Sequence, residues 1–338
     1  MNNNNHLQTI NISTSTIIRL VLILLGLVFL YLIRDILLIV VVSVIIAAAA
    51  TGPVNWLQNR RVPRFLGVLF IYLLFFLLLA SVIALVFPPL AEQIRQLSSN
   101  FPGILDKINL NLEEWRSGYQ IEGNLGSFLS QIGNKISEST ASVFSTIVGL
   151  FGGILSAAVI LVISFYLTVQ EKGIKKFFIS LTPQNHQQYV SGLIERIEVK
   201  MGGWLRGQLL IMLIVGLLVY LGLALLGVKY ALTLALIAGI LEIVPYLGPI
   251  LAAVPAVILA FLQAPLLGLL AFILYVVVQQ LENYIIFPQV MKKTVGLNPI
   301  IIIIVMLVGA KLAGVLGIVL AVPLTAAVTE FLKDIKEE

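Results

Sequence analysis

Long apolar tracts alternate with short polar segments along the chain, and this pattern predicts a series of membrane-spanning helices. The tract from Phe65 to Phe87 has 23 residues and the tract from Val143 to Val169 has 27, and neither contains a charged side chain. About 20 apolar residues are enough for a helix to cross ~30 Å of hydrocarbon. The pattern therefore predicts an all-α integral membrane protein with about six full transmembrane helices, at residues 17–33, 36–56, 65–87, 145–169, 207–228 and 265–287.

The polar segments define the remaining regions. Residues 88–146 are too polar to span a membrane and too rich in Leu and Ile to be a plain linker, so they predict a small helical extracytoplasmic cap. Residues 170–206 predict a cytoplasmic amphipathic helix, because apolar residues recur there at helical spacing. We predict a disordered N-terminal tail at residues 1–16, three transmembrane helices at 17–87 and the cap at 88–146. A fourth transmembrane helix follows at 145–169, and the amphipathic helix covers 170–206. The transport core covers 207–332, and a cytoplasmic tail covers 333–338.

Composition supports the membrane class and narrows the chemistry. The chain is 59% hydrophobic and 11% charged, whereas roughly a quarter of the residues in a soluble domain are charged. The absence of cysteine excludes disulfides, iron–sulfur centres and thiolate zinc sites. The sequence has neither an HExxH nor a Walker A motif, so nothing in it supports a metalloprotease or an ATP-driven pump. We therefore expect a protein that is not an enzyme and that needs no metal or cofactor.

The distribution of Lys and Arg predicts the orientation. The basic segments 57–64, 170–206 and 292–293 all lie in the cytoplasm if both termini do, as the positive-inside rule favours. Residues 88–146 then lie outside, and they carry four basic against six acidic residues. The net charge of +5 thus indicates basic cytoplasmic loops rather than nucleic-acid binding. Apolar helices with a protruding cap are also compatible with a homo-oligomer in the lipid bilayer.

Two apolar tracts are interrupted near their middle. In the first, at residues 230–262, the segment EIVPYLGPI contains Pro245, Tyr246, Gly248 and Pro249 between legs of 15 and 13 residues. Each leg reaches only ~20 Å, which is short for a full crossing. Because Lys229 belongs outside and the helix at 265–287 starts outside, this tract predicts a re-entrant helical hairpin that enters and leaves on the outer face.

The second interrupted tract, at residues 297–331, has a similar pattern and enters from the cytoplasmic face. Its predicted turn and hinge positions are Gly309, Gly314, Gly317 and Pro323. Short, Gly/Pro-interrupted segments of opposite orientation point to a transporter's substrate site, since a broken backbone at membrane depth must line a cavity or be buried in protein. The structural alternative is that both tracts are full helical pairs, kinked at proline and without a binding role.

Intramembrane polar residues provide the candidate site. Glu242 lies beside the first break, and a carboxylate at mid-membrane costs about 2.5–3.5 kcal/mol, so we favour a functional role over a helix-end carboxylate near the interface. Gln279, Glu282 and Asn283 share one helical face, although they could also lie at the cytoplasmic interface. Lys311 could pair with Glu242 or Glu282, contact a solute, or extend to the headgroups.

Several motifs resemble one known family. The segments PVNWLQNRRVPRFLGVL, EIVPYLGPILAAVPA, LENYIIFPQVMKKTVGLNP and GAKLAGVLGIVLAVPLTAAV are similar to those of the autoinducer-2 exporter family of bacterial membrane proteins. The resemblance covers nearly the whole chain and implies a multi-pass permease of the bacterial plasma membrane. It further implies export of a small polar furanone-derived signal used in quorum sensing, whereas some members are described as sodium/proton antiporters.

The residues and the resemblance together predict a secondary transporter that exports a small polar solute and is coupled to an ion gradient. Glu242 would exchange a proton or bind the coupling cation, and Gln279, Glu282, Asn283 and Lys311 would complete a polar cavity. The alternatives are a sodium/proton antiporter and a non-transporting membrane scaffold. A scaffold has no evident use for costly intramembrane charges, which favours transport.

Overall fold

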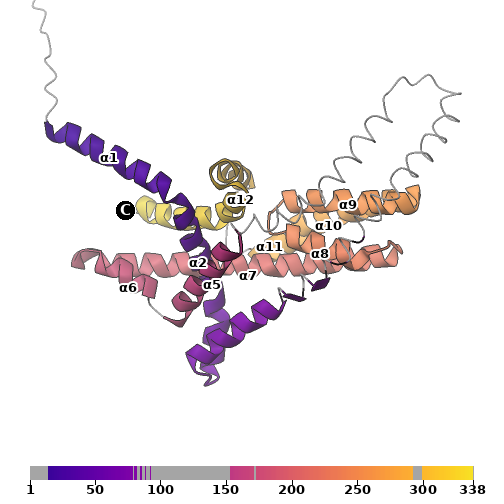
Figure 1. The fold of residues 1–338 in the computed structure, drawn as a ribbon, viewed down its shortest axis with the longest axis horizontal. Helices are drawn as coiled ribbons and strands as arrows, with labels where there is room; N and C mark the ends of the chain where they lie inside the picture. The colour runs from indigo at the N-terminus through magenta and orange to yellow at the C-terminus, as the bar shows by residue number, and fades with distance from the viewer. Residues whose placement is uncertain are drawn as a thin grey trace, which may run out of the picture.

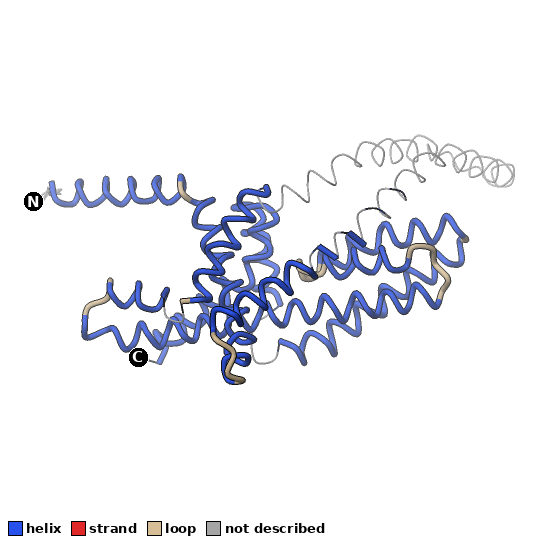
Figure 2. Tube along the Cα trace, turned by 60° about the horizontal axis from the view of Figure 1, so that its bottom comes forward, coloured by secondary structure: helices blue, strands red, loops and turns tan. Residues whose placement is uncertain are grey.

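A computed structural model describes residues 14–78, 153–170, 173–291 and 299–337, together with isolated positions between 80 and 92. All regular elements in these ranges are helices, as Figure 2 shows. Five of them are long and apolar enough to cross a membrane. These observations confirm the predicted all-α membrane class. The predicted cap at 88–146 lies almost entirely outside the described ranges.

The first two helices agree with the predicted spans to within a few residues, whereas the predicted end at residue 87 and the predicted start at residue 145 lie outside the described ranges. Helix α1 (Thr14–Leu32) passes into α2 (Arg34–Asn59) through the single residue Ile33. A further apolar helix covers Arg64–Leu78, and α5 is described over Gly153–Val169. The last three helices pack around a small core that includes Val54, Val68 and Tyr72, whereas α1 is exposed along its length.

The amphipathic helix and the fifth predicted span form one continuous element. After α6 (Gly173–Ser180) and the short 3-10 helix η1 (Gln184–His186), helix α7 runs from Gln187 to Leu225 without a break. The sequence pattern predicted a boundary near residue 206, where the polar stripe gives way to an apolar run. The structure differs because nothing there interrupts the backbone: Gly202, Gly203 and Gly207 lie within the helix. Helix α7 contacts most other elements.

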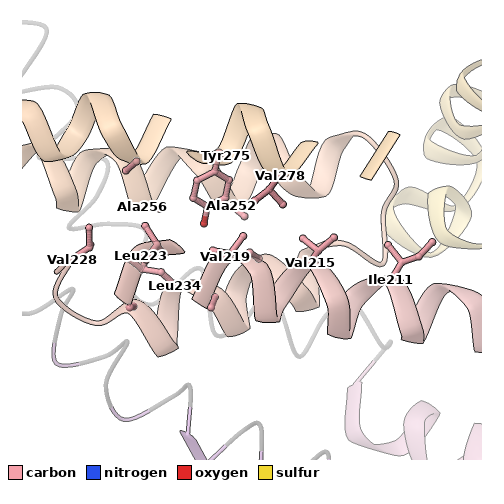
Figure 3. Close-up of a cluster of buried hydrophobic side chains, with 14 of the residues drawn as sticks. Ile211, Val215, Val219, Leu223, Val228, Leu234, Ala252, Ala256, Tyr275 and Val278 are labelled. Carbon is pink, nitrogen blue, oxygen red and sulfur yellow. The ribbon is translucent and has the colours of Figure 1, made fainter. Parts of the chain in front are cut away.

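The C-terminal half of α7 supports the largest core. Helices α8 (Ala231–Leu241) and α10 (Pro265–Leu281) pack along it, and α9 (Leu247–Gln263) packs on α8 and α10 (Figure 1). The π-helical turn η2 (Glu282–Ile286) and α11 (Phe287–Met291) follow α10. Small residues on α9 and larger ones on α7 and α10 fill the space between the helices (Figure 3). The side chains labelled in this view include Ile211, Val215, Val219, Leu223, Ala252, Ala256, Tyr275 and Val278.

Helix α12 (Pro299–Glu337) is broken in the middle of the second interrupted tract. Ala313 and Gly314 leave the helical conformation, and Gly314 has φ +60°, which glycine adopts without strain. The two arms fold against each other where Gly309 meets Gly317, since a Cβ atom on either glycine would overlap the other residue's carbonyl group. The predicted break is therefore present in α12, and its glycines allow the two arms to approach closely beside it.

Candidate ion and solute site

A tight turn separates α8 from α9 at the first predicted break. Pro245 has no N–H, and Tyr246 has φ +65°, so the helix cannot continue through these residues. At Gly248, a Cβ atom would overlap the carbonyl group of Leu241, which makes glycine necessary for the close approach of the two helices. Pro245, Gly248 and Pro249 are buried and Tyr246 is half-buried. The break is thus enclosed by protein.

Glu242 lies at the start of this turn and is completely buried, with 0% of its surface exposed. Its main-chain oxygen accepts a hydrogen bond of 2.5 Å from Nε2 of Gln208 on α7. Its carboxyl group lies beside that of Glu282. Within the described residues, neither carboxyl oxygen of Glu242 has a hydrogen-bond partner of ordinary geometry. The turn therefore presents a buried acid whose recorded side-chain neighbour is a second carboxyl group.

Glu282 reaches Glu242 from the π-helical turn η2 that follows α10. Its residue surface is 3% exposed, and its Oε2 accepts a hydrogen bond of 3.0 Å from Nε2 of Gln279. The same Nε2 lies 3.4 Å from Oδ1 of Asn283. These contacts confirm that the three side chains share one face. A π-helical turn inside a longer helix is rare and is frequently found at functional sites.

Two adjacent buried carboxyl groups restrict the chemistry of the site. If both were ionised, they would repel each other in surroundings of low polarity, and each would lose its hydration. The pair is therefore stable when it shares a proton or when a cation lies between the groups. This requirement makes the arrangement suitable for exchanging protons or binding small cations.

Gln208 belongs to this site, although the sequence analysis did not select it. It is 1% exposed, and its Oε1 atom is buried without a hydrogen-bond partner in the described part of the chain. A signal was present in the sequence, because Gln208 is the one amide side chain in the apolar run 207–228. Polar residues within transmembrane segments are rare and commonly functional.

The second hairpin does not bring its predicted residues to the carboxyl pair. Lys311 is exposed, and no ion pair joins it to Glu242 or Glu282 among the residues that the structure describes. Gly309, Gly314 and Gly317 form the hairpin turn, and Pro323 is fully buried in the second arm. These four residues shape α12 and make no contact with the acids that the structure records.

A separate charged cluster connects α7 with the C-terminal arm of α12. Glu330 is largely buried and forms ion pairs with Lys200 at 2.7 Å, Arg196 at 3.4 Å and Lys333 at 3.8 Å. These contacts indicate a structural role for Glu330, because cations from two helices surround it.

The fold and the site define an all-helical membrane protein with a buried acidic pair beside a broken helix. The chain belongs to the AI-2E family of transporters, whose family model matches residues 17–337. The candidate transport protein YueF of Bacillus subtilis is 31% identical over 297 residues, which cover 84% of this chain and 80% of YueF. YrrI of the same organism is 29% identical over 300 residues, covering 85% and 82%, and a Thermotoga maritima candidate transport protein is 28% identical over 253 residues, covering 73% and 74%.

Proposed function

We propose that the protein is a secondary transporter that exports a small polar solute from bacterial cells, with the Glu242–Glu282 pair as its ion-coupling site. The observation that carries this proposal is the burial of two neighbouring carboxyl groups beside a helix break, where no N–H or hydroxyl group of the described residues donates to either oxygen of Glu242. Such an arrangement is costly for the fold. The arrangement is kept, in this proposal, because the acidic pair binds and releases a proton or cation during transport.

The proposed cycle uses the acidic pair as an exchange site. A proton or cation binds between Glu242 and Glu282 from one side of the membrane and leaves to the other, and each state favours a different opening of the polar cavity. The turn at Pro245–Pro249 and the hairpin of α12 enter the membrane from opposite faces in this proposal. Their broken backbones line the solute path.

The solute is proposed from the family. The name of the AI-2E family supports an autoinducer-2-like molecule, a small polar compound used in quorum sensing. Acceptor oxygens of Glu242, Glu282 and Gln208 suit a ligand that is rich in hydroxyl donors. The protein would act in the bacterial plasma membrane with both termini in the cytoplasm, as the arrangement of Lys and Arg favours.

Sodium/proton antiport is the second candidate, and the same oxygens support it. Hard cations prefer oxygen ligands, and the site offers two free carboxyl oxygens of Glu242 and the free amide oxygen of Gln208. A sodium ion among them would neutralise the acidic pair as a proton does. Competition between the two ions for one site is the basis of exchange.

Transport by purified protein in liposomes with a trapped pH-sensitive dye tests the proposal. We expect an autoinducer-2 gradient or a NaCl gradient to drive proton movement in the wild type, and the Glu242→Gln variant to lose it by tenfold or more. The matched control is Glu195→Gln, which removes a carboxyl group from an exposed ion pair with Lys175. Unchanged coupled flux in Glu242→Gln would refute the coupling role, and no flux in the wild type would favour a membrane scaffold.

A further inference from the structure

Two prolines in this fold leave main-chain carbonyl groups without their usual donors. In α2, Pro53 has no N–H to donate to the oxygen of Ala49 four residues earlier. At the α8–α9 turn, Pro245 likewise cannot donate to Glu242, and the left-handed Tyr246 makes no such bond among the described residues. A buried carbonyl without a donor is costly, so each one needs a partner from elsewhere in the fold.

Helix α7 supplies both partners from positions two residues apart. Arg206 donates to Ala49 at 3.1 Å, and Gln208 donates to Glu242 at 2.5 Å. Residues two apart point to nearly opposite sides of a helix, at ~100° per residue. One short stretch of α7 is therefore bonded to the N-terminal helices on one side and to the carboxyl site on the other.

Only the nitrogen of the Gln208 side-chain amide forms a hydrogen bond in the described residues. Its Nε2 holds the carbonyl of Glu242, whereas its Oε1 is buried and has no partner in the described residues. Gln263 makes a useful comparison, because its Nε2 donates to the oxygen of Leu259 and its Oε1 accepts from the N–H of Lys229. A glutamine that only satisfies the backbone uses both ends, as Gln263 does. The amide of Gln208 instead holds the main chain of a buried acid with its Nε2 and leaves its Oε1 without a partner in the described residues.

We propose that Gln208 is a positioning residue of the carboxyl site, an inference that rests on the coupling role proposed for Glu242. Its bond to the main chain of Glu242 fixes where the carboxyl group of that residue lies relative to Glu282, and its free oxygen adds a third acceptor at the site. The affinity of the pair for a proton or cation therefore depends on Gln208, although Gln208 has no charge.

Few charged groups surround the two acids in the described residues, so an effect of Gln208 on the proton affinity of Glu242 can be measured. In the described residues, the titratable side chains recorded next to Glu242 and Glu282 are each other and Tyr246 of the turn. Gln279 donates to Glu282 from α10. Since no Lys or Arg is recorded against Glu242, the position and the neighbouring dipoles of the carboxyl group determine how readily it holds a proton.

Labelling with dicyclohexylcarbodiimide provides a test that needs no transported solute. This reagent reacts with protonated carboxyl groups in apolar surroundings, and mass spectrometry of peptides resolves Glu242 from Glu282. We expect labelling of Glu242 in the wild type to fall as pH is raised. In Gln208→Met the midpoint should shift by about 0.5 pH unit or more, which is a roughly threefold change in proton affinity. Gln208→Asn, whose shorter amide cannot reach the carbonyl, should shift it too.

The matched control is Gln263→Met, which removes the same functional group from backbone contacts at the far end of α9. Its midpoint should equal that of the wild type, and thermal unfolding should show that all variants are folded. Equal midpoints in the wild type and both Gln208 variants, or an equal shift in Gln263→Met, would overturn the positioning role while leaving Glu242 as the coupling residue. If wild-type Glu242 is not labelled at any pH, the coupling role itself fails.

Discussion

At the scale of single residues, Glu242 is an acid held in unfavourable surroundings in the interior of the fold. Glu242 is fully buried, its neighbour is another acid, and the cationic side chains that surround Glu330 elsewhere have no counterpart beside it in the described residues. The contrast between the two glutamates is informative, since Glu330 is neutralised by three cations and Glu242 by none. Groups kept at the expense of stability are commonly those used for function.

A stability measurement follows from this cost. We expect Glu242→Gln to raise the free energy of unfolding by about 1 kcal/mol above neutral pH, because a neutral amide removes the repulsion with Glu282. The gain should be smaller at low pH, where the wild-type pair holds a proton. Thermal unfolding in detergent across a pH series checks this expectation. A loss of stability at all pH values would contradict it and would mean that the carboxyl group has a stabilising partner.

At the scale of helices, close packing depends on small residues and on proline. The arms of α12 meet at Gly309 and Gly317, and α7 crosses α2 at Gly202 against the carbonyl of Ala48. Arg206 donates to the carbonyl of Ala49 in α2, four residues before Pro53. Small residues allow helix backbones to approach, which is the main source of helix association in lipid. The elements are thus joined by backbone contacts and a few polar bonds in addition to apolar packing.

The hairpin of α12 provides a direct test of this packing. Gly317→Ala places a methyl group against the carbonyl of Gly309, so the arms must separate at a cost of about 1–3 kcal/mol. Gly26→Ala in α1 is the control, because no atom lies within 4 Å of its added carbon and alanine favours helix. Thermal unfolding should show a loss for Gly317→Ala and no loss for Gly26→Ala; equal stability of both variants would disprove the close contact.

The bond between Arg206 and α2 can be tested with a double-mutant cycle. Arg206→Leu should destabilise the protein by about 1–3 kcal/mol, since it leaves the carbonyl of Ala49 without a donor. In the Pro53→Ala background the loss should be smaller, because the N–H of alanine can donate to that carbonyl. Urea or thermal unfolding of the four proteins measures the coupling. Additive effects would show that Arg206 does not compensate for the proline.

At the scale of the whole molecule, α7 connects the parts. Its N-terminal portion is paired with α12 through Arg196, Lys200 and Glu330, its middle bonds to α2 and to the carboxyl site, and its C-terminal half supports the main core. A continuous helix with contacts to α2, α8, α10 and α12 can transmit a change at the acidic pair to the C-terminal arm of α12. Such transmission requires two arrangements of the contacts.

The ionic connection between α7 and α12 predicts a salt dependence of stability. Glu330→Gln should lower the free energy of unfolding by about 1–3 kcal/mol, since three cations then lose their partner at a largely buried position. Raising NaCl to 1 M should reduce the difference between wild type and variant, because salt screens the partly exposed cations. Thermal unfolding at low and high salt measures both effects, and a difference that does not change with salt would contradict an electrostatic origin.

The sequence predicts the helical class, the two breaks and the polar face of α10, since apolar length, proline and glycine positions and helical spacing are local properties. It does not predict that α7 is continuous, because a change from an amphipathic to an apolar pattern marks an environment rather than a helix end. It also does not reveal Gln208, whose role depends on which turn of α7 lies against the α8–α9 break. Lys311 shows the converse: its charge made it a candidate, but it forms no ion pair with either acid among the described residues.

The π-helical turn at Glu282–Ile286 has a consequence for how this protein can change in evolution. Such a turn contains one residue more than the α-helix that would replace it. Deleting a single residue such as Ile285 would restore regular winding and rotate everything on one side of the deletion by ~100°. The direction in which Glu282 points therefore depends partly on how many residues this turn contains. A one-residue deletion here should disturb the acidic pair more than most substitutions do.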